Sequence, residues 1–255
     1  MPSDRLYDDI GRTYTATRQE DPRLAAAIWA ALGDAESVLN VGAGAGAYEP
    51  KDREVLALEP SEVMIAQRPE GAAPVMRGSV ESIPLRDDSV DAAMAVLSDH
   101  HWSDRRAGLG EMRRVARRRV VLFNFNPAEF ARFWFATEYL PEFMDLIAAG
   151  YKEPGVWERE LRMMLGYITI EPVSIPHDCR DGFFGAYWRR PELLLDETVR
   201  DGISVFSQVP AEAVERALAQ LGADLESGVW RERHKDLLEL DELDLGYTLV
   251  TAEFG

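Results

Sequence analysis

The chain has 255 residues, of which 28 are Lys or Arg and 45 are Asp or Glu, so its formal net charge is -17 at pH 7. This length allows one or two domains with a sizeable buried core, and a hydrophobic fraction of 46% is typical of a globular protein. Because nucleic acids and anionic membrane surfaces are bound by clustered cations, the acidic balance argues against both as partners.

Apolar runs such as residues 25–32 are too short to cross a bilayer, and residues 1–5 lack an apolar signal core. The single cysteine, Cys179, permits neither an intrachain disulfide nor a cysteine-based zinc site. We therefore expect a cytoplasmic protein without a metal ion, and we leave a homodimer open.

The first half of the chain alternates helical patterns with short apolar runs. Apolar residues on one face predict helices over residues 21–32 and 105–117. Strands are predicted over residues 37–41, 54–59, 73–76, 90–97 and 120–124. Strands that alternate with helices indicate right-handed crossovers and a parallel sheet.

The second half is richer in helical patterns. Helices are predicted over residues 130–149, 156–165, 191–200 and 210–226, and strands over residues 168–175 and 246–254. Two late strands with helices between them indicate one more parallel crossover and then an antiparallel finish. The aromatic helix over residues 130–149 belongs either to the core or to a cap over a substrate.

The strongest signal is a buried strand that runs directly into Gly42, Gly44 and Gly46. Glycine permits positive φ and close approach to a ligand, and a following helix N-terminus favours an anionic group. Glu59 closes the next strand, where a carboxylate can accept both ribose hydroxyls of a nucleoside. The alternative is a tight packing turn with a solvated Glu59. Because the glycine spacing is not G-x-G-x-x-G, a nicotinamide cofactor is the weaker interpretation.

Histidines supply the candidate general bases. His100 and His101 directly follow the 90–97 strand, and Asp99 is placed to orient one imidazole. A base with a pKa near 7 suits a proton-transfer step, while a structural histidine bonded to nearby backbone is the alternative. We favour His101 over His100 and keep His177 in reserve.

The segment 176–190 combines carboxylates, arginines and aromatic side chains after the 168–175 strand. Loops in such places often hold a substrate. Arg189 can clamp an anionic group, and Tyr187 and Trp188 can stack on a ring. The alternative is a solvated loop whose aromatic side chains fill the core.

Residues 37–125 resemble the class I S-adenosylmethionine-dependent methyltransferases of the small-molecule type 11 kind. The resemblance lies in five blocks that occur in the family's order: residues 40–46 (NVGAGAG), 59–64 (EPSEVM), 78–91 (GSVESIPLRDDSVD), 96–102 (VLSDHHW) and 110–115 (GEMRRV).

This resemblance implies a Rossmann-like α/β fold with a seven-stranded, mostly parallel sheet in the order 3-2-1-4-5-7-6 and helical cap insertions. It implies a single methyltransferase domain, residues 1–255, with an N-terminal helical arm (1–33) and a cofactor-binding half (34–126). The substrate-side half (127–255) would carry cap insertions near 127–155 and 177–210.

The resemblance also implies the cofactor S-adenosylmethionine, whose product is S-adenosylhomocysteine. Glu59 would bind the ribose, Met64 would pack against adenine, and Arg18 would lie near the methionine carboxylate. The full set of implied cofactor residues is Tyr14, Arg18, Asn40, Gly42, Ala43, Gly44, Glu59, Pro60, Met64, Ser79, Val80, Glu81 and Leu97.

Two of these positions depart from the family pattern. Asn40 and Ser79 stand where the family usually has acidic residues. Asn40 removes a charge near the methionine ammonium, and Ser79 accepts a hydrogen bond more weakly than a carboxylate.

The expected function is therefore methyl transfer from S-adenosylmethionine to an oxygen, nitrogen or carbon nucleophile of a small molecule. His101, His100 and His177 are the catalytic candidates, and the substrate would contact Trp102, Tyr187, Trp188 and Arg189. Two alternatives stay open: a protein that binds S-adenosylmethionine without transferring its methyl group, and, less favoured, a nicotinamide-dependent oxidoreductase.

Overall fold

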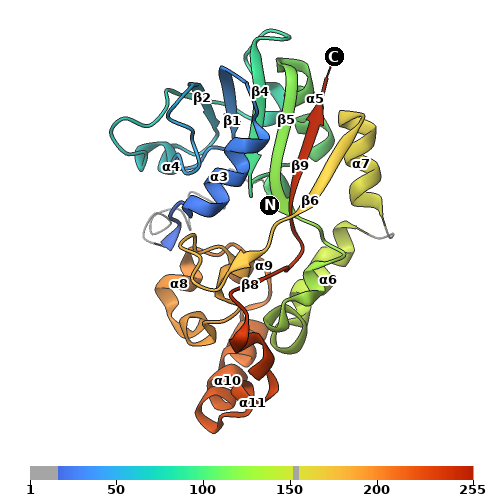
Figure 1. The fold of residues 1–255 in the computed structure, drawn as a ribbon. Coiled ribbons are helices and arrows are strands. Elements are labelled where there is room, and N and C mark those ends of the chain that lie inside the picture. The colour runs from blue at the N-terminus through green and yellow to red at the C-terminus, as the bar shows by residue number, and fades with distance from the viewer. Residues whose placement is uncertain (1–16, 152–154, 255) are drawn as a thin grey trace.

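A seven-stranded sheet forms the centre of the protein in a computed structural model that describes residues 17–151 and 155–254 (Figure 1). Its strands follow the order β3-β2-β1-β4-β5-β9-β6. Their bounds are Ser37–Val41 for β1, Glu54–Glu59 for β2, Val75–Arg77 for β3, Val90–Val96 for β4, Ala116–Phe125 for β5, Ile168–Pro172 for β6 and Tyr247–Glu253 for β9.

The predicted strand order is confirmed, because β9 is the seventh strand of this sheet along the chain. β9 runs antiparallel to both of its neighbours, β5 and β6, so β6 points in the same direction as β1 to β5. The predicted antiparallel finish is therefore also confirmed. A separate two-stranded ladder, β7 (Ile175–Pro176) with β8 (Glu242–Leu243), was not predicted.

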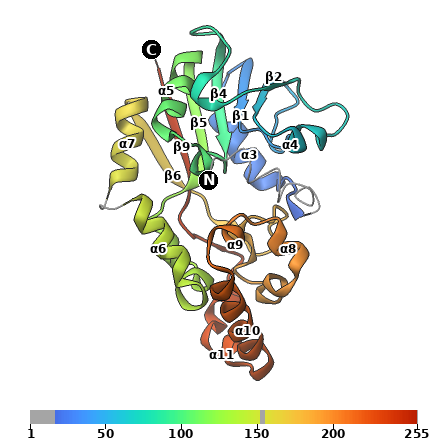
Figure 2. The ribbon, with the colours of Figure 1, turned by 180° about the vertical axis from the view of Figure 1, so that it is seen from behind.

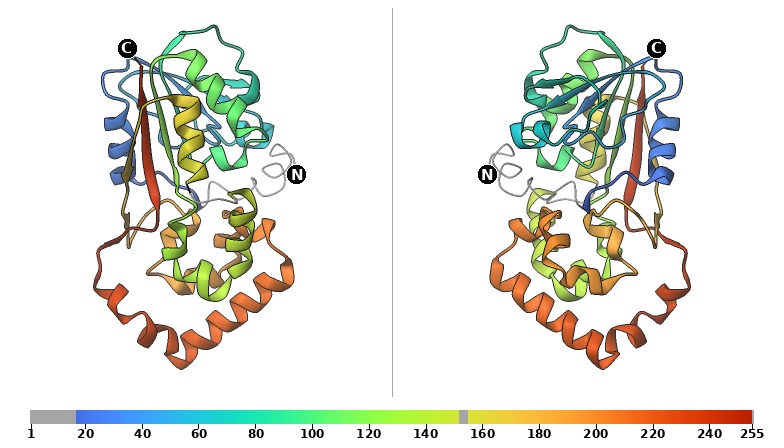
Figure 3. Two further views of the ribbon diagram at one scale, coloured as in Figure 1. Left: turned by 90° about the vertical axis from the view of Figure 1, so that its right-hand side faces the viewer. Right: turned by 90° about the vertical axis from the view of Figure 1, so that its left-hand side faces the viewer.

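Helices cover both faces of the sheet, as Figure 3 shows in its side views. Helix α3 (Pro22–Ala31) lies on one face, and α5 (Arg105–Val115) and α7 (Val156–Leu165) lie on the other. Side chains alternate between the two faces along each strand. Val38 and Met94 belong to the core cluster that contains α3 residues, whereas Leu39 and Ala93 belong to the cluster that contains α5 and α7 residues.

A second group of helices gathers beyond the carboxyl ends of the parallel strands (Figures 1 and 2). It contains α6 (Pro141–Gly150), α8 (Glu197–Asp201), α9 (Val205–Gln208), α10 (Ala211–Ser227) and α11 (Val229–Arg233). These helices come from the β5–β6 and β6–β9 connections. Two parts of the chain that are far apart in sequence therefore face the same edge of the sheet. A short helix α4 (Glu62–Ala66) follows β2.

The predicted helix over residues 130–149 is broken into pieces. A 3-10 turn covers Phe130–Arg132, a π-helical turn covers Phe135–Tyr139, and α6 begins only at Pro141. Proline disfavours the helical conformation in the residue before it, and Leu140 accordingly has φ -127 and ψ 57. The aromatic residues thereby pack in several directions rather than along one helix face.

Other predicted boundaries also shift. Strand β5 begins at Ala116, four residues before its predicted start. Helix α5 therefore ends at Val115, because the chain passes directly from the helix into the strand. The predicted helix over residues 191–200 is a 3-10 turn followed by α8, whose N-cap Asp196 accepts a hydrogen bond from the Thr198 amide at 2.9 Å. Within the described ranges, no helix is both long enough and apolar enough to span a bilayer.

The aromatic part of segment 176–190 contributes largely to the core. The Trp188 side chain has no exposed surface, and its indole N–H donates to the Ile175 carbonyl at 2.9 Å. The Trp188 carbonyl in turn accepts from the indole of Trp134 at 2.8 Å. Trp188 therefore joins the β7 ladder to the aromatic turn at the start of the β5–β6 connection.

We predict that Trp188→Phe lowers the free energy of unfolding by about 1–3 kcal/mol, because the buried Ile175 carbonyl loses its donor. Tyr167→Phe, at a side chain with 78% exposure, is the control and should change stability by less than about 0.5 kcal/mol. Urea denaturation measures both variants. Equal stabilities for the two would contradict the structural role of Trp188.

Candidate functional site

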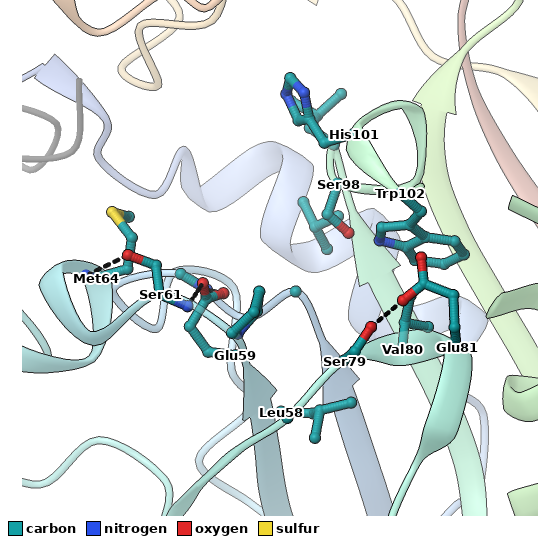
Figure 4. A pocket seen from close by; sticks show the side chains of 16 residues that line it. Leu58, Glu59, Ser61, Met64, Ser79, Val80, Glu81, Ser98, His101 and Trp102 are labelled. Atoms are coloured by element: carbon teal, nitrogen blue, oxygen red, sulfur yellow. Dashed lines mark hydrogen bonds between the residues drawn. The ribbon is translucent and has the colours of Figure 1, made fainter. Parts of the chain in front are cut away.

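A pocket with an empty volume of about 690 Å³ opens at the carboxyl ends of β1, β2 and β4 (Figure 4). It brings together nine residues of the cofactor set expected from the sequence: Gly42, Gly44, Glu59, Pro60, Met64, Ser79, Val80, Glu81 and Leu97. The sequence analysis missed five further lining residues, Leu58, Ser61, Gly78, Val96 and Ser98, although each is adjacent to a residue that it did identify.

The glycine turn forms the floor of this pocket, and backbone geometry requires glycine there. Gly42 and Gly44 have φ of 64° and 53°, a region that residues with side chains rarely adopt. A Cβ on Gly42 would lie 2.7 Å from the Ser98 Cβ, and one on Gly44 would lie 3.3 Å from the Met64 Cε. The turn therefore leaves its backbone open to a ligand.

Glu59 is 4% exposed, and its carboxylate is oriented by backbone donors. One oxygen accepts from the Gly44 amide at 2.8 Å, and the other accepts from the Ser61 amide at 3.0 Å. These two bonds fix the orientation of the carboxylate, which lines the pocket at the end of β2. Figure 4 shows Glu59 and Met64 on one side, Val80, Glu81 and Trp102 on the other, and His101 beyond Ser98.

Asn40 is buried behind the glycine turn and does not line the pocket. Its amide N–H donates to the Glu49 carboxylate at 3.2 Å, and Glu49 pairs with Arg68 at 2.7 Å. Arg68 also donates to the Gly44 carbonyl at 3.3 Å. Asn40 therefore takes part in a buried network that supports the turn from below. Ala43, another residue of the expected set, is buried nearby, with its amide bonded to the Leu58 carbonyl.

Ser79 and Glu81 act as a pair at the far side of the pocket. The Ser79 hydroxyl donates to the Glu81 carboxylate, which also accepts from the Asp104 amide at 3.2 Å. Burial would raise the pKa of Glu81, but the hydrogen bonds from Ser79 and from backbone N–H groups outweigh it and hold that pKa below its usual range. A carboxylate is thus present in the pocket two residues after the position where Ser79 replaces the family's acid.

A second pocket, with an empty volume of about 490 Å³, adjoins the first. Leu97 and His101 line both pockets, so the two spaces meet at the end of β4. Six aromatic side chains other than histidine line the second pocket: Phe125, Phe130, Phe143, Phe183, Phe184 and Tyr247. Phe130 and Phe143 lie in the 130–149 stretch, and Phe183 and Phe184 lie in the 176–190 segment, but the sequence analysis named none of the six as a substrate residue.

The histidine pair lies beside this junction, with ring centroids 3.9 Å apart. His100 is exposed to the second pocket. Desolvation by the surrounding protein, together with the charges of Arg18 and Arg105, lowers the pKa of His100 below its usual range. Desolvation and the neighbouring His100 lower the pKa of His101 well below its usual range, against the opposing effect of Asp99. Both imidazoles are therefore neutral at pH 7 and able to accept a proton.

Asp99 does not orient an imidazole through a hydrogen bond, contrary to the expectation. Its carboxylate accepts from the Arg105 guanidinium at 2.9 Å and from the Asn124 amide at 3.1 Å. Arg105 reaches it from the first turn of α5, a contact that chain adjacency to the histidines does not predict. The His101 Nε2 instead lies 3.5 Å from the Ser204 hydroxyl, at the start of α9.

Arg18 and Tyr14 were both expected at the methionine end of the cofactor. Arg18 lines the second pocket, and its guanidinium pairs with the buried Asp181 at 2.6 Å. Asp181 also accepts from the Tyr48 hydroxyl at 2.9 Å. Tyr14 lies outside the described residues.

Several expected catalytic and substrate residues lie away from the second pocket. His177 lines neither pocket, and its amide donates to the Asp241 carbonyl beside the β7–β8 ladder. Tyr187 and Trp188 are buried in the core, and the Arg189 guanidinium donates to the Leu240 carbonyl at 2.6 Å.

Trp102 does reach a pocket, but it lines the first pocket rather than the second. Its ring packs against α5, where a Cβ on Gly108 would lie 2.6 Å from the Trp102 Cε3. Within residues 17–151 and 155–254, no group of His, Cys, Asp and Glu side chains is arranged to hold a metal ion.

The strand order and the glycine turn with its strand-terminal acid define a Rossmann-like enzyme that binds a nucleoside. A family model described as a methyltransferase domain matches residues 39–123. A crystal structure described as a methyltransferase from an antibiotic biosynthesis pathway of Anabaena variabilis is 32% identical, with a TM-score of 0.84. That match covers 93% of this chain and 99% of the other. The chain therefore belongs to the class I S-adenosylmethionine-dependent methyltransferases.

More distant structures share the fold alone. Geranyl diphosphate C-methyltransferase from Streptomyces coelicolor is 15% identical, with a TM-score of 0.51 over 91% of this chain and 78% of the other. The [4+2]-cyclase SpnF is 15% identical, with a TM-score of 0.52 over 97% of this chain and 93% of the other. A search of curated proteins found no match.

Proposed function

We propose that the protein transfers a methyl group from S-adenosylmethionine to an oxygen, nitrogen or carbon nucleophile of a small molecule held in the second pocket. One observation carries this proposal: Leu97 and His101 line both pockets, so ligands in the two spaces can touch. The first pocket is built from residues 42–102, and most of the second from residues after 124. This supports a division into a cofactor-binding half (34–126) and a substrate-side half (127–255) within one domain.

The first pocket suits S-adenosylmethionine residue by residue. Glu59, whose carboxylate is oriented by the Gly44 and Ser61 amides, would hold the ribose hydroxyls. Ser79 and Glu81 would face the adenine amine, with Met64 and Val80 against the ring. The backbone of Gly42 and Gly44, which lines the pocket without side chains, would accommodate the amino-acid end.

When bound, the cofactor supplies an electrophilic methyl group on a sulfonium. The chain's own residues position the acceptor and manage its proton. Holding the two reactants in line can supply about 7–11 kcal/mol of barrier reduction. The neutral imidazole of His101 accepts the proton that an O–H or N–H nucleophile releases as its bond to the methyl carbon forms.

The cytoplasmic location and the homodimer stay predictions. A protein that bound S-adenosylmethionine without transferring its methyl group would yield no S-adenosylhomocysteine, and this product separates that alternative from methyl transfer.

We predict that Glu59→Ala weakens S-adenosylhomocysteine binding by about 1.5–3 kcal/mol, roughly ten- to more than a hundredfold, because charge-assisted hydrogen bonds to the ribose are lost. Glu62→Ala is the matched control, since the Glu62 side chain is 73% exposed on α4. Isothermal titration calorimetry measures both. Unchanged affinity in Glu59→Ala would remove Glu59 from the cofactor site.

We predict that His101→Gln lowers turnover by about 10²–10⁴-fold, because it removes the general base while keeping a polar side chain of similar size. His177→Gln is the control, because His177 lines neither pocket. Affinity for S-adenosylhomocysteine should survive in both variants. If His101→Gln turns over like His177→Gln, alignment alone drives the reaction.

The lowered histidine pKa values predict a particular pH profile. A neutral imidazole loses its function as a base only when the pH falls through its folded-state pKa, which lies below the usual range for both His100 and His101. The rate should therefore show no break near pH 6.5. Unfolded histidines take up protons below about pH 6.5 while these two stay neutral, so stability also falls on acidification. Circular dichroism at each pH separates the two effects. A rate that halves near pH 6.5 in folded protein would contradict the assignment.

A further inference from the structure

We infer that the methyl acceptor is an aromatic compound that presents a phenolic hydroxyl at the junction of the two pockets and extends a polar substituent into an outer groove. This inference rests on the proposed function and specifies its substrate class.

The walls of the second pocket select a flat ring. Phe130 stacks on Phe184 with a centroid distance of 6.1 Å and an interplanar angle of 21°, and Phe183 lies 4.8 Å from Tyr247. All four side chains are at most 5% exposed, so the surrounding protein holds their positions. Aromatic pairs gain about 0.5–1.5 kcal/mol each beyond the burial of their area. A planar aromatic ligand can collect several such contacts at once.

The charges around the pocket select a neutral ligand. None of the described residues that line it is Asp or Glu, so these residues offer an ammonium group no counter-ion. The cation that does line it, Arg18, already pairs with Asp181 at 2.6 Å, so an acceptor carboxylate gains little from it. Burying an unpaired charge is costly, whereas a neutral phenol enters without that penalty.

The polar groups of the pocket converge where the hydroxyl is needed. The Ser204 hydroxyl and the His101 Nε2 lie 3.5 Å apart at the junction, and Leu97 lines both spaces beside them. An acceptor hydroxyl placed between these two polar atoms can bond to both. The new bond joins the phenolic oxygen to the methyl carbon, the electron pair of the carbon–sulfur bond stays on sulfur, and the proton moves to the imidazole.

The second pocket continues into an outer groove with an empty volume of about 1380 Å³. The two spaces share His100, Phe125, Phe143, Ser204 and Val205. Farther out, the groove wall turns polar.

The polar part of the groove contains Arg105 and Arg106, which both pair with Glu160, at 2.7 and 2.9 Å. A substituent on the ring therefore passes from an aromatic wall to a charged, solvated one. The acceptor accordingly has an apolar ring at one end and a polar group at the other.

The test compares three bicyclic probes on protein saturated with S-adenosylhomocysteine: 2-naphthol, its saturated counterpart trans-2-decalol, and the ammonium 2-(aminomethyl)naphthalene. Calorimetry should show that 2-naphthol binds about tenfold or more tighter than each of the other two probes. Two aromatic contacts contribute enough binding free energy for an affinity ratio of about this size. Equal or tighter binding of trans-2-decalol overturns the aromatic selection. Equal or tighter binding of the ammonium overturns the selection for a neutral ligand.

Two variants place the binding in the second pocket. Val205→Trp should fill the passage between pocket and groove and reduce 2-naphthol affinity at least tenfold, while S-adenosylhomocysteine still binds. Phe184→Leu removes a ring with little loss of apolar volume and should narrow the ratio between 2-naphthol and trans-2-decalol. Val229→Trp, at a side chain 42% exposed on α11, is the control. If Val205→Trp fails to bind S-adenosylhomocysteine, the deciding result is the ratio of 2-naphthol affinity to trans-2-decalol affinity in Phe184→Leu. A ratio equal to that of the parent protein overturns the inference.

Product analysis separates failure of this inference from failure of the proposed function. With S-adenosylmethionine, 2-naphthol should give methyl 2-naphthyl ether and S-adenosylhomocysteine. Preferred methylation of trans-2-decalol or of the amine overturns the inference and leaves methyl transfer intact. Tight binding of 2-naphthol without S-adenosylhomocysteine from any of the three probes overturns methyl transfer and, with it, the acceptor role of the ring.

Discussion

The backbone at Leu97 has φ of 49°, and the arrangement of both pockets depends on it. A bulky residue in this conformation costs on the order of 1–2 kcal/mol, so the surrounding structure must hold it in place. The Leu97 amide donates to the Phe123 carbonyl of β5 at 2.7 Å, and the side chain is 9% exposed. The turn brings the Ser98 hydroxyl to the Val41 carbonyl at 3.1 Å, directly over the glycine turn. The same turn places His101 between the two pockets.

Paired charges surround an uncharged acceptor space. The chain is strongly acidic, with a net charge of -17, yet two buried carboxylates on this side of the sheet are matched by arginines. Asp99 pairs with Arg105, and Asp181 pairs with Arg18. The aromatic walls desolvate the imidazoles without offering a carboxylate that would protonate them. A base that stays neutral at pH 7 and the proposed preference for an uncharged acceptor therefore depend on the same surroundings.

Local signals explain why the cofactor side was predictable. A buried strand that runs into glycines, and an acid that closes the next strand, lie within residues 37–59 and require no knowledge of distant segments. The second pocket is different, because its walls come from segments far apart in the chain: β5, the 3-10 turn at Phe130, α6, the 176–190 segment, residues 202–205 and β9. An aromatic residue in a core and one in a pocket wall leave the same pattern in the sequence. Phe184 lines the pocket while Trp188, four residues later, is fully buried.

The remaining differences between prediction and structure depend on hydrogen-bond partners that the sequence does not reveal. Asp99 was expected to orient one of its histidine neighbours, but its Oδ2 instead accepts hydrogen bonds from Arg105 of α5 and Asn124 of β5. Ser79 was expected to weaken binding of the adenine ring. In the structure it donates a hydrogen bond to Glu81, whose carboxylate lies on the same wall of the pocket. The break before α6 was the exception, since Pro141 announces it in the sequence.

The central claim is that a methyl group passes from the first pocket to a small molecule in the second. Incubation of the protein with methyl-labelled S-adenosylmethionine and a small-molecule extract of the cells that make it tests this most directly. The account predicts that label appears in a low-mass aromatic product, with one S-adenosylhomocysteine formed for each label transferred. Label that stays on S-adenosylmethionine, although the protein binds that cofactor, would contradict it.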